Sequence, residues 1–221
     1  DTGNGKKVPM VVAMDPLDPA AEAYRNLRMN LTFMSTTESP IKSILFSSPG
    51  PDEGKSTTAL NFAVMLAQQG QRVLLIDADL RRPGQHEIWG ISNNDGLMKM
   101  VNDDAAIASP PLVETQVTNL SILPAGGQPE IPADILSSQR MGEIIGVLKA
   151  RADYVLFDTP PVLTSTDAAL LGNKLDGMLL VVRAGHTRRD HTARAKEALE
   201  RINVRVLGCV LTNAPRERMG K

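Results

Sequence analysis

Short runs of apolar residues alternate along this chain with longer segments in which apolar residues recur every three or four positions. Such segments lie at about 18–34, 59–69, 133–150 and 189–201, with a short one at 167–171. Continuous apolar runs are typical of strands buried on both faces, and their alternation with helices favours a parallel sheet. The pattern therefore predicts an α/β fold with a doubly wound, mostly parallel sheet and helices on both faces. The apolar runs are Ile44–Phe46, Val73–Ile76, Leu120–Leu123, Tyr154–Phe157, Met178–Val182 and Val206–Thr212.

The same pattern predicts one domain, residues 19–214, between two flanking segments. Residues 1–18 are polar and rich in turn residues, so we expect an arm or linker. Asp18 and Pro19 then provide an N-cap and a first-turn residue for a helix. Residues 84–118 are the least patterned part of the domain, and we expect 215–221 to be the start of a truncated C-terminal tail.

Composition limits the function classes without choosing one. Apolar residues make up 42% of the chain, charged residues 22%, and the net charge is −1, which excludes bulk attraction to nucleic acid. Residues 183–221 hold ten Lys or Arg against four acids, which we interpret as a solvated helix face and tail, so no nucleic-acid partner is expected. The single Cys209 excludes an intramolecular disulfide and a cysteine-ligated cluster, and its apolar neighbours predict a buried strand position.

A glycine-rich stretch, residues 47–57, follows the first apolar run and opens a helical segment. It ends in Gly54, Lys55 and Ser56, as phosphate-binding loops do, although Pro49 stands where the first glycine of that motif is expected and Gly50 is one position late. Backbone N–H groups of such a loop can bind a triphosphate, the lysine adds charge at its β/γ end, and the hydroxyl can ligate Mg²⁺. The sequence therefore predicts a P-loop NTPase fold that binds ATP and Mg²⁺.

Acidic residues follow two of the predicted strands. Asp77 and Asp79 come after Val73–Ile76, and Asp158 comes after Tyr154–Phe157. A buried carboxylate is costly unless it is paired, and Mg²⁺ on a triphosphate would provide the cation, with Ser56 as a direct ligand. Alternatively, the acids cap helices or pair with Arg81 and Arg82. The acceptor also stays open: either Asp77 accepts a hydroxyl proton while Asp79 stays on the metal, or the acceptor is water.

The first predicted helix carries charged residues at intervals of three. Glu22, Arg25 and Arg28 form one stripe along it. Taken alone, this stripe is an ordinary solvated face of ion pairs.

These motifs together resemble the bacterial tyrosine kinases that are tied to polysaccharide synthesis. That family combines a phosphate loop with aliphatics plus D-x-D-x-R, matched by 74–81, and with aliphatics plus D-[ST]-P, matched by 155–160. The stripe at 22–28 is similar to the family's E-x-x-R-x-x-R ring-assembly motif. The resemblance covers about residues 18–214.

The resemblance implies roles for individual residues. Asp77 would be the base for a tyrosine hydroxyl, Arg81 would stabilise phosphate charge, and His86 is given no chemical role. Ser56, Asp79 and Asp158 would hold the metal, and Lys55, Asp77, Asp79, Arg81 and Asp158 form the expected catalytic set. Expected nucleotide contacts are Pro51, Asp52, Glu53, Gly54, Lys55, Ser56 and Thr57, with Arg183 and Asn213 on the adenine side. Pro49 and Asp52 depart from the family's loop pattern.

The resemblance also implies partners. We expect a ring homo-oligomer, with an octamer as the family's example, joined through Glu22, Arg25 and Arg28. A membrane activator domain would be fused upstream or carried by a separate protein, placing the kinase domain at the cytoplasmic face of the bacterial inner membrane. The family's substrate is its own tyrosine-rich tail, whereas this chain has only Tyr24 and Tyr154.

Two other functions stay open at this point. A partition-type switch ATPase would hydrolyse ATP to drive dimer exchange, but such proteins carry a second lysine five positions before Lys55, where this chain has Gly50. A catalytically weak nucleotide-binding scaffold would control polymer assembly through its oligomeric state alone.

Overall fold

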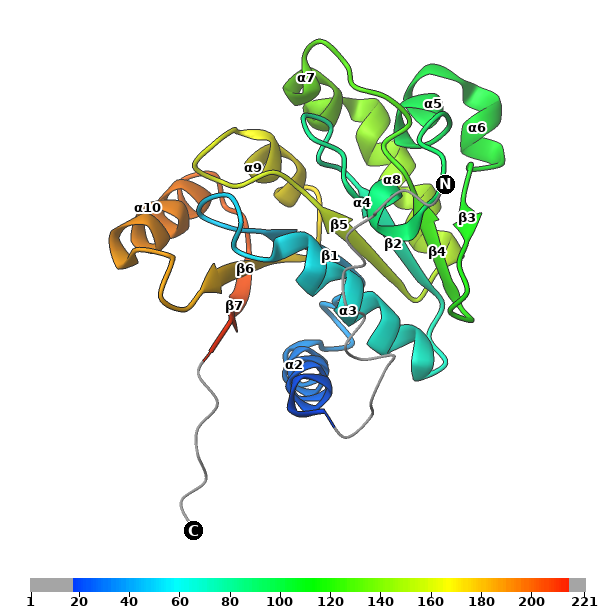
Figure 1. Ribbon diagram of the computed structural model, residues 1–221. Coiled ribbons are helices and arrows are strands. Elements are labelled where there is room, and N and C mark those ends of the chain that lie inside the picture. The colour runs from blue at the N-terminus through cyan, green and yellow to red at the C-terminus, as the bar shows by residue number, and fades with distance from the viewer. Residues whose placement is uncertain (1–17, 215–221) are drawn as a thin grey trace, which may run out of the picture.

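The computed structural model describes residues 18–214 and contains one seven-stranded sheet with helices on both faces (Figure 1). The strand order is β3-β4-β2-β5-β1-β6-β7, and every described pairing is parallel except that of β3 with β4. This confirms the predicted fold class, and the crossover order places β1 and β5 at the centre. The strands are β1 Ser43–Ser47, β2 Val73–Asp77, β3 Val113–Glu114, β4 Leu120–Leu123, β5 Tyr154–Asp158, β6 Gly177–Arg183 and β7 Val206–Thr212.

Alternating residues of the central strands separate the core into two layers. In β1, Leu45 faces one layer while Ile44 and Phe46 face the other. Both layers are covered, which explains why these strands are continuous apolar runs instead of alternating ones. The helices are α2 Pro19–Met34, α3 Lys55–Gln68, α4 Gln85–Trp89, α5 Leu97–Asn102, α6 Asp104–Ala108, α7 Pro132–Ser137, α8 Gln139–Arg151, α9 Asp167–Gly172 and α10 Arg189–Glu200.

Helices α2 and α3 lie on one side of the sheet, and α5, α7, α8 and α9 lie on the other (Figure 1). Asp18 caps α2 as predicted, because its carboxylate accepts the Ala20 N–H at 2.7 Å. Helix α3 is followed by Gly70, which has φ +81°, the left-handed conformation that favours glycine after a helix. No described helix has the length and apolar character that crossing a membrane requires.

Two predictions are wrong. The segment 133–150 is two helices, because Ser138 adopts an extended conformation and its hydroxyl accepts the Met141 N–H at 3.1 Å as the N-cap of α8. Cys209 is exposed rather than buried, because β7 is an edge strand with one face uncovered. The predicted arm and tail lie outside the described residues, apart from Asp18.

Candidate active site

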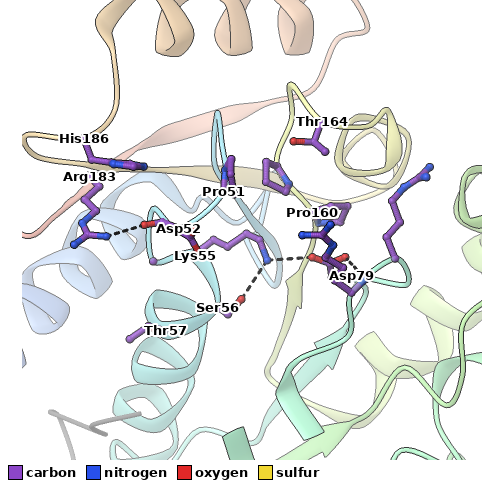
Figure 2. Close-up of a pocket in the computed structure, with 14 residues that line it drawn as sticks. Pro51, Asp52, Lys55, Ser56, Thr57, Asp79, Pro160, Thr164, Arg183 and His186 are labelled. Atoms are coloured by element: carbon purple, nitrogen blue, oxygen red, sulfur yellow. Dashed lines mark hydrogen bonds and ion pairs between the residues drawn. The ribbon is translucent and has the colours of Figure 1, made fainter. Parts of the chain in front are cut away.

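The carboxyl ends of the central strands surround a pocket of about 980 Å³. Its walls come from the loop after β1, from the segments after β2 and β5, and from the end of β6 (Figure 2). The lining residues are Pro51, Asp52, Gly54, Lys55, Ser56, Thr57, Asp79, Arg81, Arg82, Pro160, Pro161, Thr164, Arg183 and His186.

The phosphate loop enters α3 through two left-handed residues. Asp52 has φ +58° and Gly54 has φ +90°. Gly54 is required there, because a side chain would be strained at this φ. The Thr58 hydroxyl donates to the Gly54 carbonyl at 2.8 Å and so fixes the junction. Consequently the N-terminal end of α3, with its unpaired N–H groups, belongs to the pocket wall, as anion binding requires.

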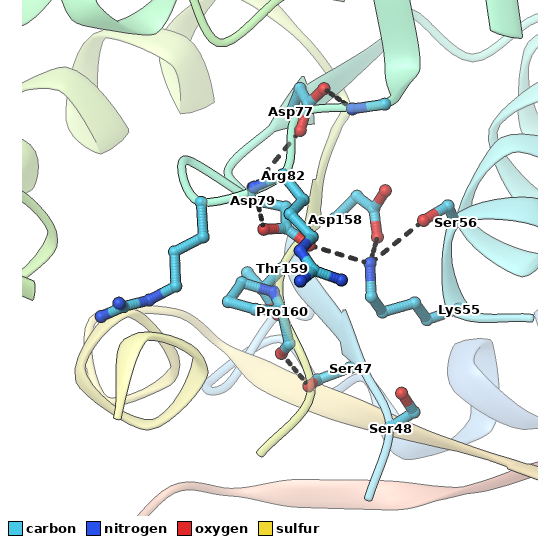
Figure 3. Close-up of polar contacts among 12 residues, drawn as sticks. Ser47, Ser48, Lys55, Ser56, Asp77, Asp79, Arg82, Asp158, Thr159 and Pro160 are labelled. Carbon is cyan, nitrogen blue, oxygen red and sulfur yellow. Dashed lines mark hydrogen bonds and ion pairs between the residues drawn. The ribbon is translucent and has the colours of Figure 1, made fainter. Parts of the chain in front are cut away.

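The Lys55 amine lies among oxygens from three segments (Figure 3). Its Nζ is 3.2 Å from Ser56 Oγ, 3.3 Å from Asp79 Oδ2 and 3.4 Å from Asp158 Oδ1. Burial alone would lower the pKa of Lys55, but the two carboxylates outweigh it and raise that pKa, so the amine stays charged. All three contacts are longer than a strong charge-assisted hydrogen bond, so the lysine is shared rather than held by one partner.

Asp77 lies behind this group and does not line the pocket. Its carboxylate is fully buried and accepts the N–H groups of Gly84 at 2.9 Å and Gln85 at 2.8 Å. Burial, together with the charge of Asp158, raises the pKa of Asp77 to about 7. Burial also raises the pKa of Asp79, against the opposing effect of Lys55. Of the three predicted acids, two therefore contact Lys55 and one supports the turn after β2.

Arg81 and Arg82 line the pocket without pairing with the three acids through their guanidinium groups. Arg81 forms a two-bonded ion pair with the buried Asp167 of α9, at 2.7 and 2.9 Å. Arg82 bonds to Asp79 only through its backbone N–H, at 3.0 Å. The alternative prediction, that the three acids pair with the side chains of Arg81 and Arg82, is therefore not supported by the contacts among residues 18–214.

Two polar residues of the site were missed by the sequence reasoning. Gln85 is fully buried and donates from Nε2 to Asp158 Oδ2 at 2.8 Å, so it orients the carboxylate that faces Lys55. Asp167 anchors Arg81. Neither belongs to a motif, and the one available signal was an acidic residue in the first turn of a predicted helix.

Of the two residues expected on the adenine side, one lines the pocket and the other does not. Arg183 lines the pocket, and its Nη1 donates to the Asp52 carbonyl at 3.1 Å (Figure 2). Asn213 does not line it; this exposed residue has φ +53°, and its Nδ2 is 3.5 Å from the Ala184 carbonyl. Glu53 is buried and does not line the pocket either.

The donors around Lys55 fit Mg²⁺ only in company with a nucleotide. Ser56, Asp79 and Asp158 present hard oxygen atoms, the kind this ion prefers. However, in residues 18–214 no three His, Cys, Asp or Glu side chains group closely enough to hold a metal by themselves. Magnesium is commonly held by one or two carboxylates together with substrate phosphates, and this oxygen set suits that arrangement.

The charged stripe lies on α2, and none of its residues lines the pocket. Glu22 and Arg25 form an ion pair of 2.5 Å on the helix surface. Arg28 Nε is buried and has no hydrogen-bond partner among the described residues. One nitrogen at the end of the stripe is thus unpaired within residues 18–214.

The fold and this site define a nucleotide-binding protein with the P-loop NTPase architecture. The family model described as an AAA domain matches residues 42–185. The septum site-determining protein MinD complexed with Mg-ADP, from Pyrococcus horikoshii OT3, superposes with a TM-score of 0.65 at 25% identity, over 77% of this chain and 70% of that one.

Other comparisons define the family. The chain is 41% identical over 202 residues to tyrosine-protein kinase YwqD of Bacillus subtilis, covering 91% of this chain and 84% of that protein. It is 32% identical to tyrosine-protein kinase wzc of Salmonella typhimurium, over 97% of this chain but 30% of that protein. The kinase domain of Escherichia coli tyrosine kinase ETK superposes with a TM-score of 0.87 at 27% identity, over 100% of this chain and 86% of that one. The chain belongs to the bacterial tyrosine-protein kinases.

Proposed function

We propose that this domain transfers the γ-phosphoryl group of ATP, bound with Mg²⁺, to a tyrosine hydroxyl of a protein. The proposal depends on one observation: the Lys55 amine, at the end of the phosphate loop, lies within 3.4 Å of carboxylate oxygens of both Asp79 and Asp158. A charged lysine beside two carboxylates is suited to hold a triphosphate and its cation together. The kinship with tyrosine-protein kinases supplies the class of acceptor.

The roles follow from position. The backbone of residues 51–57 and the Lys55 amine would bind the phosphates, and Ser56, Asp79 and Asp158 would hold Mg²⁺. The ion supplies charge neutralisation on the phosphoryl oxygens. Gln85 keeps Asp158 oriented toward Lys55, and Arg81, anchored by Asp167, stays at the pocket wall. Arg183 belongs to the opposite wall, where the base of the nucleotide would lie.

Asp77 is proposed as the base for the tyrosine hydroxyl. A pKa of about 7 suits proton abstraction at neutral pH. The side chain reaches the pocket only if the turn that donates from Gly84 and Gln85 moves, because both backbone N–H groups bind its Oδ2. Asp79, which lines the pocket, is the competing base, and the comparison of Asp77→Asn with Asp79→Asn decides between them.

The acceptor tyrosine comes from outside this sequence. The chain has two tyrosines, and neither lines the pocket. Tyr24 is half-buried and packs against the core layer that contains α3, and burial raises its pKa to about 12. Tyr154 is the first residue of β5. A tyrosine-rich tail or a separate protein is therefore the proposed substrate.

We further propose that the domain works in a ring of identical chains, with an octamer as the expected size, at the cytoplasmic face of the bacterial inner membrane. A membrane activator domain, fused upstream or on a separate protein, would control it, and exopolysaccharide or capsule synthesis and export would be the regulated process. Arg28 Nε, at the end of the α2 stripe, is buried without a hydrogen-bond partner in the part of the chain that the structure describes, which supports a partner chain there.

The test is a phosphorylation assay with Mg·ATP and a tyrosine-containing acceptor protein. Phosphotyrosine is measured by mass spectrometry and released phosphate in parallel, with Glu38→Ala as a surface control. We expect phosphotyrosine from the wild type and none from Lys55→Met. Released phosphate without phosphotyrosine would favour the switch ATPase, and nucleotide binding without either product would favour the scaffold.

A further inference from the structure

Two neighbouring arginines line the pocket, but their guanidinium groups have different surroundings. Arg81 donates from Nε and Nη2 to the two carboxylate oxygens of Asp167, whose side chain is completely buried. That carboxylate balances the charge of Arg81 and occupies two of its guanidinium nitrogens. The guanidinium of Arg82 has no hydrogen bond or ion pair within residues 18–214, although its backbone N–H is bonded. The pocket wall therefore holds one balanced arginine and one unbalanced one.

The backbone that carries Arg82 is held in place beside the Lys55 group. The Arg82 N–H donates to Asp79 Oδ1 at 3.0 Å, and the other oxygen of that carboxylate is 3.3 Å from Lys55 Nζ. The preceding carbonyl, that of Arg81, accepts from Gln128 Nε2 at 3.2 Å. The backbone of Arg82 is thus fixed by bonds among the described residues, whereas its guanidinium is left for a ligand.

The side chain of Arg82 points into the pocket on the side where Lys55 lies. Figure 3 shows it running from the turn after β2 past the Asp79 carboxylate toward the Lys55 amine, and the three residues line the same pocket. Because Arg82 is exposed, water solvates its charge, and the group remains available to a bound anion. A guanidinium is a planar fork that binds two phosphate oxygens at once. The position therefore suits a phosphoryl group bound at Lys55.

We propose that Arg82 is a catalytic residue, whose guanidinium donates to the γ-phosphoryl oxygens of ATP during transfer. In that step the tyrosine oxygen bonds to the γ-phosphorus, the bond from that phosphorus to the leaving oxygen of ADP breaks, and the hydroxyl proton passes to the base. A cation held beside the γ-phosphoryl oxygens lowers the barrier. The role that the sequence motif implied for Arg81 is thus assigned to its neighbour, and Arg81 holds the turn against α9. The inference rests on the proposed function, because it concerns the same phosphoryl transfer.

The first test compares arginine variants in phosphoryl transfer. Arg82→Met keeps most of the stem and removes the charge, so kcat for phosphotyrosine formation should fall about 100-fold or more, with KM for Mg·ATP within about threefold. Arg82→Lys keeps a charge but not the fork, and should recover only part of the loss. Arg194→Met, at an exposed residue of α10 outside the pocket, is the matched control and should behave like the wild type.

The second test measures binding and needs no turnover. Mg·ADP with aluminium fluoride mimics the transferring phosphoryl group, so Arg82→Met should bind it at least about 30-fold more weakly, while its Kd for Mg·ATP changes less than about threefold. The thermal midpoint separates the two arginines. Arg81→Met leaves the buried carboxylate of Asp167 unpaired and should lower the midpoint, whereas Arg82→Met should leave it unchanged.

The outcomes separate this role from the proposed function. If the wild type forms no phosphotyrosine, the proposed function falls, and the role of Arg82 falls with it. If the wild type forms it and Arg82→Met keeps a wild-type kcat, or if Mg·ATP and the analogue are weakened equally, only the role of Arg82 is overturned. A rise confined to the KM for the acceptor protein would also overturn it, because Arg82 would then bind the substrate protein. Loss of transfer in Arg81→Met at an unchanged thermal midpoint, with Arg82→Met active, would return the role to Arg81.

Discussion

Two lysine–carboxylate groups lie at opposite ends of the same sheet, and they are built differently. At the carboxyl ends of the strands, Lys55 is shared by Asp79 and Asp158 at 3.3 and 3.4 Å. At the amino ends, Lys149 has one partner, Asp176, at 2.7 Å. The first group thus has two carboxylates for one lysine, and we call it unmatched. The second has one carboxylate for one lysine, and we call it matched.

The electrostatic consequences are opposite. Asp176 also accepts the N–H groups of Lys42 and Ser43, and despite the effect of burial these bonds lower its pKa. Burial and mutual repulsion raise the pKa of Asp77 and Asp79 instead. The matched group stabilises the folded chain, and the unmatched one stores unfavourable charge that a bound cation and nucleotide would relieve. The comparison teaches that a buried ion pair indicates function when its charges do not balance.

The largest expected difference is in catalysis. Lys55→Met should reduce phosphotyrosine formation at least about 1000-fold, because the amine is the one described lysine at the phosphate loop and stabilises transferring phosphate charge. Lys149→Met should leave the rate within about twofold of the wild type. Initial rates at saturating Mg·ATP measure both, and comparable losses in the two variants would remove the distinction between the groups.

The next difference is in the pH dependence of stability. Asp77 has a pKa of about 7 when folded, above its ordinary value, so the folded protein binds a proton that the unfolded chain releases. Its contribution is therefore complete in acid and is lost as pH rises toward 7, with a slope of at most about 1.4 kcal/mol per pH unit. Asp176 has a lowered pKa, so its contribution is present at neutral pH and is lost only on acidification.

Denaturant unfolding of the metal-free protein between pH 5 and 7 measures this slope. Asp77→Asn cannot titrate and should flatten the decline, whereas Asp176→Asn should leave it unchanged. A wild-type curve that rises over this range would contradict the raised pKa of Asp77.

Six of the seven strands, the phosphate loop and the carboxyl-end acids could be predicted, because each is encoded in adjacent residues; β3, two residues within the least patterned segment, could not. The contacts that balance or anchor those acids could not. Asp167 meets Arg81 across 86 positions and Gln85 meets Asp158 across 73, so their pairing depends on which segments the fold brings together. Asp176 and Lys149 went unnoticed for the same reason.

Local patterns also misled where position in the sheet decides. Cys209 has the neighbours of a buried strand residue, but exposure depends on β7 being at the edge, which the order of strands along the chain does not reveal. Ser138 was hidden inside an apolar repeat that continues on both sides of it, and only its extended backbone divides α7 from α8.

A smaller difference is expected between the two groups in the free energy of unfolding at pH 7. Asp176→Asn should lower the free energy of unfolding by about 1–2 kcal/mol, because it removes the ion pair and a hydrogen-bond acceptor. Asp158→Asn should cost less than about 0.5 kcal/mol in metal-free protein, or stabilise it, because Asp158 raises the pKa values of Asp77 and Asp79. Denaturant unfolding at pH 7 with a chelator compares them, and an equal loss in both variants would mean that the Lys55 group is as well matched as the other.

The smallest effect should come from a second ion pair at the amino ends, between Arg72 and Asp153. It is well aligned at 2.9 Å, but the two side chains are 62% and 38% exposed, against 32% and 21% for Lys149 and Asp176. Water and salt screen exposed charges, so Arg72→Met should leave the thermal midpoint within error of the wild type. Lys149→Met should lower the midpoint measurably, and by a smaller amount at high salt. If Arg72→Met lowered the thermal midpoint more than Lys149→Met, burial would not explain why ion pairs at the amino ends stabilise the fold. The stabilising effect of Asp176 would then come from its hydrogen bonds to the backbone and not from Lys149.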